Sequence, residues 1–104
     1  MHASVAVTGE YDPDNAVSRS FEIVNKRGLH ARASAKFVQL VDNYNAHVRV
    51  SKDGMTVGGT SIMGLMMLAA SPGCCIEVSA SGEQADAVLE ALQALIADRF
   101  GEEC

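Results

Sequence analysis

Basic residues are scarce in this sequence. Only eight of its 104 residues are lysine or arginine, and the formal net charge is −5. Because nucleic-acid phosphates are bound by basic patches, we expect no nucleic-acid partner. The chain also has no apolar run near the roughly 18 residues that a membrane span needs, so no membrane association is expected. Its first residues lack the basic start and apolar middle of a secretory signal, and we therefore expect a cytoplasmic protein.

Cysteine is scarce as well. There are three cysteines, and two of them, Cys74 and Cys75, are neighbours that rarely bridge each other. No CxxC pair or nearby histidine completes a zinc site, and His2 and His47 stand at no metal-binding spacing. The GxxxxGK[ST] phosphate-binding pattern is absent. We expect free thiols at the start of a strand, no metal and no cofactor.

The composition that remains is that of one small globular domain. Hydrophobic residues make up 48% and charged residues 20% of the chain, which argues against disorder and against a repeat protein. Residues 1–19 are weakly patterned and contain a turn-like YDPDN segment, so we predict a flexible N-terminal leader. Regular patterning starts at Ser20, and residues 20–104 are predicted to form the folded domain.

Strand and helix patterns follow one another along this domain. Apolar and polar residues alternate, as in half-buried strands, in residues 20–25, 46–51, 55–59 and 75–81. Helical spacing of apolar residues extends from just after Gly28 to Tyr44, from Ser61 to about Ala70, and from near Glu83 to Gly101.

The predicted element order is therefore β-α-β-β-α-β-α. Because every strand alternates rather than being apolar on both faces, helices should cover only one side of the sheet. We predict a two-layer α+β fold in which three helices cover one face of a mostly antiparallel, four-stranded sheet.

One histidine stands at the expected start of the first helix, in the segment NKRGLHARAS. A helix N-terminus offers unpaired N–H groups and a positive dipole end, which bind anions and favour a neutral, nucleophilic imidazole. Gly28 permits the turn that leads into the helix, and Arg32 is near enough to bind an anion on His30. This combination suits a transient phosphohistidine. On spacing alone, an equally good interpretation is that His30 only caps the helix and Arg32 is a solvated charge.

The second informative segment, TSIMGLMML, is apolar nearly all round. A helix at the edge of so small a domain cannot bury every side, so part of it should be exposed as a methionine-rich partner interface. The alternative is a helix that is fully buried.

The sequence resembles the HPr family, the histidine phosphocarriers of the bacterial phosphotransferase system. The resemblance rests on GLHAR and on SIMGLMML some thirty residues later, and it extends from about Ser20 to the C-terminus. It implies the family's open-faced β-sandwich. It also implies that His30 is phosphorylated on Nδ1, that Arg32 steadies the phosphoryl group, and that Ser61 matches a serine phosphorylated by HPr kinase/phosphorylase.

The resemblance also implies the partners. Phosphoryl would arrive from enzyme I and leave to an enzyme IIA domain, with both docking over His30 and the apolar helix. The residues expected to bind these partners are Ile62, Met63, Leu65 and Met66. We expect a monomer.

Three details qualify the resemblance. Many members have proline where this chain has Ala33; the change adds an N–H to the expected phosphate cradle of Ala31, Arg32 and Ala33. NKRGLHAR and the acidic RFGEE tail look more like the nitrogen-related branch, NPr. Ser61 can cap a helix whether or not it is modified.

The leading hypothesis is a phosphocarrier without small-molecule turnover of its own, regulated by serine phosphorylation. It would act within a phosphotransferase chain rather than as a stand-alone enzyme. The alternative is a regulatory interaction module whose phosphorylation state controls a kinase or a transcription regulator; retention of both His30 and Arg32 favours the carrier.

Overall fold

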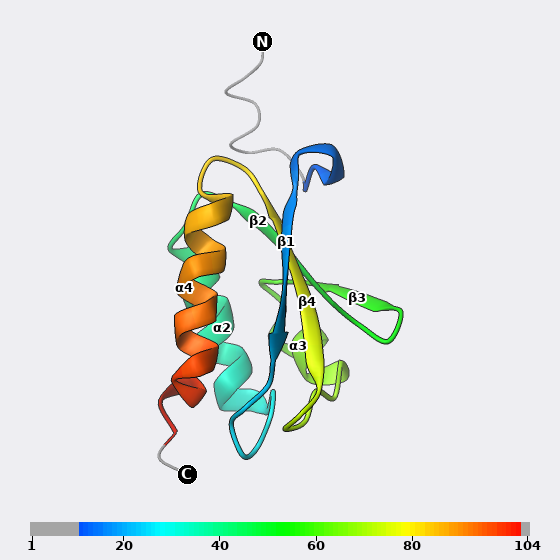
Figure 1. The fold of residues 1–104 in the computed structure, drawn as a ribbon, viewed down its shortest axis with the longest axis vertical. Coiled ribbons are helices and arrows are strands. Elements are labelled where there is room, and N and C mark those ends of the chain that lie inside the picture. Colours follow the sequence, from blue (N-terminus) through cyan, green and yellow to red (C-terminus); the bar gives the residue numbers. More distant parts are fainter. Residues whose placement is uncertain (1–10, 103–104) are drawn as a thin grey trace.

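The computed structural model describes residues 11–102, which form a helical layer packed on a sheet (Figure 1). The sheet contains β1 (Val17–Glu22), β2 (His47–Lys52), β3 (Met55–Gly58) and β4 (Cys75–Ser81). The helices are α2 (Ala31–Asp42), α3 (Ile62–Met67) and α4 (Ala85–Ala97), with short 3-10 turns η1 (Pro13–Asn15) and η2 (Arg99–Gly101).

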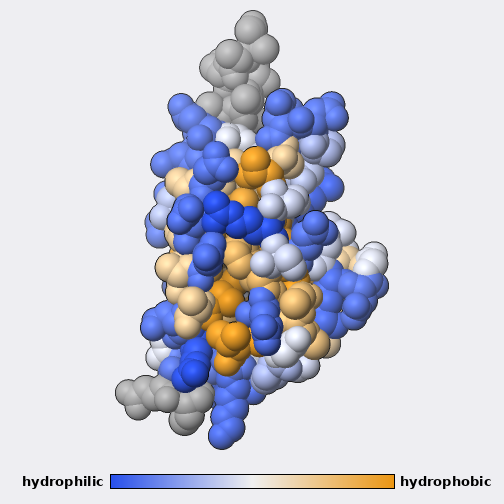
Figure 2. All heavy atoms as spheres, in the orientation of Figure 1, coloured by the Kyte–Doolittle hydropathy of each residue, from blue (hydrophilic) through white to orange (hydrophobic). Residues whose placement is uncertain are grey.

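The four strands lie in the order β1-β4-β2-β3, and every neighbouring pair is antiparallel. The register places Phe21 opposite Ile76, and Val50 opposite Val78. These alternating apolar side chains are buried against helical residues such as Phe37 and Leu92. Apolar atoms are visible between the helical layer and the sheet (Figure 2). The predicted α+β, open-faced sandwich is confirmed.

Several element boundaries differ from the predicted ones, and three of these shifts have a clear cause. β1 begins at Val17, before Ser20, because Val17 to Arg19 already pair with β4. α3 ends at Met67, before Ala70, and Ala69 there adopts a positive φ of 53°. α4 ends at Ala97, short of Gly101, because the next turn contains two further positive-φ residues, Arg99 and Phe100.

The segment assigned to the leader is in contact with the sheet where the structure describes it. The Tyr11 hydroxyl donates to Ser79 Oγ over 2.8 Å, and the Arg49 guanidinium lies 4.4 Å from the centre of the Tyr11 ring. Ser79 alternates with the core residues Val78 and Ala80, so this contact lies on the sheet face away from the helices. The packed domain thus includes residues before Ser20, whereas residues 1–10 lie outside the described part.

None of the helices described in residues 11–102 is long and apolar enough to cross a membrane.

Candidate functional site

His30 is the N-cap of α2. Its backbone is extended, and its Nδ1 accepts a hydrogen bond from the Arg32 backbone N–H over 3.3 Å. The loop that carries it is fixed by the segment after α3, since Leu29 N donates to Ala70 O over 3.0 Å. Gly28 adopts a φ of +66°, and a Cβ on it would come within 2.2 Å of that same Ala70 oxygen. The glycine is therefore required by conformation and by close approach.

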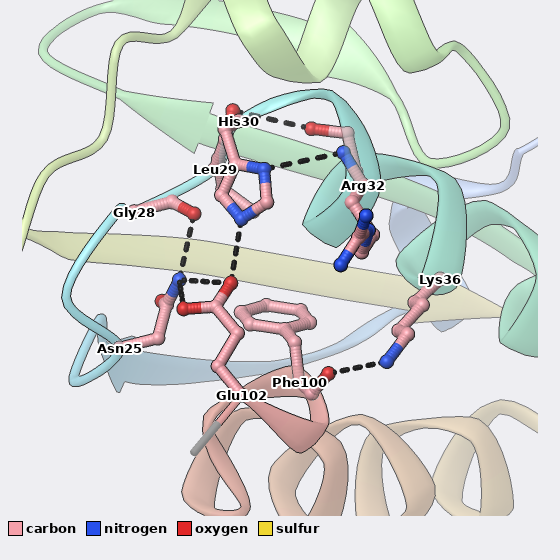
Figure 3. A network of polar contacts seen from close by, with 9 residues as sticks. Asn25, Gly28, Leu29, His30, Arg32, Lys36, Phe100 and Glu102 are labelled. Atoms are coloured by element: carbon pink, nitrogen blue, oxygen red, sulfur yellow. Dashed lines mark hydrogen bonds and ion pairs between the residues drawn. The ribbon is translucent and has the colours of Figure 1, made fainter. Parts of the chain in front are cut away.

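Glu102 contacts the other ring nitrogen of His30. His30 Nε2 lies 2.5 Å from Glu102 Oε2, and the two side chains are only 18% and 16% exposed (Figure 3). A carboxylate can only accept and a backbone N–H can only donate. The two contacts together therefore assign the proton to Nε2 and leave a lone pair on Nδ1, at the helix N-terminus.

Asn25 holds Glu102 in place from within the core. This fully buried amide donates from Nδ2 to Gly28 O over 2.8 Å and to both Glu102 carboxylate oxygens over 3.3 and 3.2 Å. The hydrogen bond from His30 lowers the pKa of Glu102 below its usual range. Burial opposes this shift, while the Asn25 amide and the Arg27 charge reinforce it.

The turn after α4 places Glu102 next to His30. Arg99 and Phe100 adopt φ values of 58° and 55°, and Gly101 follows at 78°. The Phe100 ring is buried, and Lys36 Nζ on α2 donates to the Phe100 carbonyl over 2.7 Å (Figure 3). The ring and the lysine thus fasten the chain end beside α2.

Arg32 lies in the first turn of α2, and it is exposed. Within residues 11–102, its guanidinium is engaged in no hydrogen bond or ion pair, so it is available to an anion near His30. The first helical backbone bond runs from Ser34 N to His30 O, which leaves the amides of Ala31, Arg32 and Ala33 ahead of the helical ladder. The Ala33 methyl group is buried, so this residue can offer an anion only its backbone.

Ser61 is the N-cap of α3, and its Oγ accepts from Gly64 N over 2.9 Å. The capping interpretation is therefore correct for this structure, and the exposed hydroxyl remains reachable.

α3 exposes one apolar face, which we call the methionine patch: Ile62, Met63, Met66 and Met67. Met63 is 74% exposed and Met67 62% exposed, so the alternative of a fully buried helix is wrong. The inclusion of Leu65 among the partner-binding residues is also wrong. Its side chain points into the core and is fully buried, because it lies on the opposite side of this short helix.

The remaining site expectations concern metals and thiols. Cys74 and Cys75 are free thiols, and Cys75 opens β4 as predicted. Among residues 11–102, no group of three histidine, cysteine or acidic side chains is placed to hold a metal. Cys104 and His2 lie outside the described residues.

Sequence reasoning missed Glu102 and Asn25. In the sequence, Glu102 is only part of the acidic RFGEE tail, and Asn25 only the end of a predicted strand. The available clue was Gly101 directly before an acidic residue, which indicates a sharp turn after the last helix. Nothing in the sequence pattern says where that turn leads.

Comparison with known proteins identifies the family. The protein-family model described as "PTS HPr component phosphorylation site" matches residues 17–98 of this sequence. The chain belongs to the HPr family. It is accordingly a phosphocarrier of the phosphotransferase system, and the segments GLHAR and SIMGLMML both lie within the matched residues.

Individual relatives agree. The phosphocarrier protein HPr of Cupriavidus necator is 48% identical over 86 residues, covering 83% of this chain and 97% of the relative. The phosphocarrier protein NPr of Shewanella violacea is 35% identical over 86 residues, covering 83% and 94%. Assignment to the nitrogen-related branch stays a prediction, because relatives named HPr are also matched.

Solved HPr structures share the fold. A crystal structure of HPr-C-His from Thermoanaerobacter tengcongensis aligns with a TM-score of 0.80 and 41% identity, covering 85% of this chain and 99% of the other. A structure titled as an HPr dimer from the same organism aligns with a TM-score of 0.67 and 43% identity, covering 79% and 94%. The monomer expected for this chain stays a prediction.

Proposed function

We propose that His30 accepts a phosphoryl group on Nδ1 from enzyme I, which draws it from phosphoenolpyruvate, and passes it to an enzyme IIA domain. The observation that carries the proposal is the lone pair on Nδ1, presented at the N-terminus of α2 while Nε2 faces Glu102. A neutral imidazole in this orientation is the nucleophile that the reaction needs.

The step conserves atoms and charge. The Nδ1 lone pair attacks phosphorus, the new N–P bond forms, and the bond from phosphorus to the donor atom of enzyme I breaks. As phosphorus approaches, the Arg32 N–H leaves Nδ1 and becomes free to bind a phosphoryl oxygen. The Arg32 guanidinium and the amides of Ala31 and Ala33 supply further donors to the same oxygens.

Docking of both partners is assigned to the methionine patch. α3 packs against α2, and the segment that follows α3 is hydrogen-bonded to the His30 loop. A partner that covers the patch would therefore reach the histidine as well. Flexible, polarizable methionines suit a surface that must accept two different proteins in turn.

The labelling experiment tests the carrier function. Incubation with enzyme I and phosphoenolpyruvate should give an acid-labile, base-stable phosphoryl adduct, and His30→Ala should give none. His47→Ala is the matched control and should label like the wild type. Absence of any adduct, or equal labelling of His30→Ala, would refute the proposal.

We further propose that Ser61 is phosphorylated by HPr kinase/phosphorylase. Its hydroxyl is exposed, and the added charge of about −2 would be tolerated at the start of α3. The same charge would lie beside Ile62 in the docking surface, so it should weaken binding of enzyme I. Incubation with the kinase and ATP should label the wild type but not Ser61→Ala; label that survives this substitution rejects the assignment.

A further inference from the structure

The turn that positions Glu102 lies after α4 and is not part of the sheet or of the helices that cover it. The residue follows α4 and lies 72 positions from His30 along the chain, yet its carboxylate ends on the imidazole. Two non-glycine residues in the left-handed region, Arg99 and Phe100, bring it there, and such conformations are strained for residues with a side chain. The Lys36 hydrogen bond to Phe100 O and the buried Phe100 ring hold the resulting turn.

The Glu102 carboxylate is also hydrogen-bonded by a buried side chain, that of Asn25. Asn25 is fully buried and spends its Nδ2 donors on Gly28 O and on Glu102, while its Oδ1 has no partner within the described residues. An orphaned buried amide oxygen costs stability, so its presence in a folded protein calls for an explanation. The Asn25 amide connects the Glu102 carboxylate to Gly28, in the loop that carries His30.

We propose that Glu102, held by Asn25, is a positioning residue that keeps the proton of His30 on Nε2 throughout the phosphoryl cycle. The inference rests on the proposed phosphorylation of Nδ1. A free neutral imidazole exchanges between two tautomers, and only the one with Nε2–H offers a lone pair at Nδ1. Glu102 accepts from Nε2–H and so selects the reactive tautomer.

The same contact acts on the phosphorylated ring. Once phosphorus is bonded to Nδ1, a ring that keeps its Nε2 proton carries a positive charge, which the Glu102 carboxylate offsets. If that proton were lost, the bare nitrogen would face the carboxylate, and two acceptors would repel each other. On transfer to the acceptor, the N–P bond breaks and the ring leaves as neutral imidazole. Its proton has stayed on Nε2, so no proton has to move in either direction.

Two substitutions separate geometry from charge. Glu102→Leu removes the acceptor, whereas Glu102→Gln keeps an oxygen acceptor without the charge. Glu90→Gln is the matched control, because it removes an exposed carboxylate from the outer side of α4. Nitrogen-15 NMR of the His30 ring above neutral pH reports the tautomer without any partner protein. Rapid-quench transfer from phosphorylated enzyme I reports the rate.

We expect the wild type and Glu90→Gln to hold a single Nε2–H tautomer. Glu102→Leu should show both tautomers, and its transfer should be slower by about tenfold or more, as expected for loss of a charge-assisted hydrogen bond. Glu102→Gln should keep the tautomer but still transfer more slowly. An unchanged tautomer or an unchanged rate in Glu102→Leu overturns the proposal and leaves Glu102 as an anchor of the chain end. Failure of phosphohistidine transfer itself would be recognised separately, by wild-type protein that does not label.

Discussion

At the scale of single residues, the protonation pattern of the His30 ring follows from the groups that its two nitrogens contact. The Arg32 N–H at Nδ1 and the Glu102 carboxylate at Nε2 together set which nitrogen carries the proton and which keeps a lone pair. His30 and Arg32 could be selected from the sequence, because a histidine at the start of a helix lies where backbone N–H groups and the helix dipole bind anions. Glu102 and Asn25 could not, since their roles arise only when the chain end folds back over the His30 loop.

The lowered pKa of Glu102 gives a pH dependence of stability. Above the ordinary pKa of 4.5 this carboxylate is ionised in both the folded and the unfolded state. Its contacts with His30 and Asn25 then make their full contribution to the stability of the folded protein. As pH falls through the lower, folded-state value, that stabilisation is lost. The free energy of unfolding of the wild type should therefore fall more steeply as the pH is lowered below 4.5 than that of Glu102→Gln, measured by urea denaturation. Glu90→Gln should follow the wild type; a Glu102→Gln profile as steep as the wild type's would contradict this account.

At the scale of elements, α3 shows the limit of pattern analysis. Six residues make fewer than two helical turns, and nearly all of them are apolar, so the sequence offers no period from which to choose a buried side. Exposure of part of the helix was predictable from the size of the domain. The buried side was not, because it depends on the contacts of α3 with α2 and β3.

A pair of alanine substitutions tests the two sides of α3. Leu65→Ala should lower the free energy of unfolding by about 2–5 kcal/mol, because it leaves a cavity in the core. Met63→Ala should change it by no more than about 0.5 kcal/mol, because that side chain is exposed. Met63→Ala should instead weaken binding of enzyme I, measured by calorimetry. Similar stabilities for the two variants would show that the sides are assigned wrongly.

At the scale of the whole molecule, the site is assembled from three distant parts of the chain. These are the loop before α2, the segment after α3 and the turn after α4. The element order and the one-sided sheet were predictable, because strand alternation and helical spacing are local properties of the sequence. The early start of β1 was not, since the exposed Val17 joins the sheet only through pairing with Ala80.

Substitution of Gly28 tests how tightly two of these parts are joined. Gly28→Ala should lower the free energy of unfolding by at least about 1 kcal/mol, because it combines a left-handed φ with a clash against Ala70 O. It should also slow phosphoryl transfer, since it displaces the loop that carries His30. Gly73→Ala is the matched control, with a φ of +89° but nothing within 4 Å of the added methyl group. It shares the backbone strain, so equal stability losses and equal transfer rates would argue against a close-packed His30 loop.

The most direct test of the central claim is to locate the phosphoryl group itself. Protein labelled with nitrogen-15 in histidine can be phosphorylated with enzyme I and phosphoenolpyruvate and examined by NMR for nitrogen–phosphorus coupling. The account predicts coupling at Nδ1 of His30, with the proton on Nε2. Coupling at Nε2, or phosphate on His2 or His47 with His30 unmodified, would contradict it.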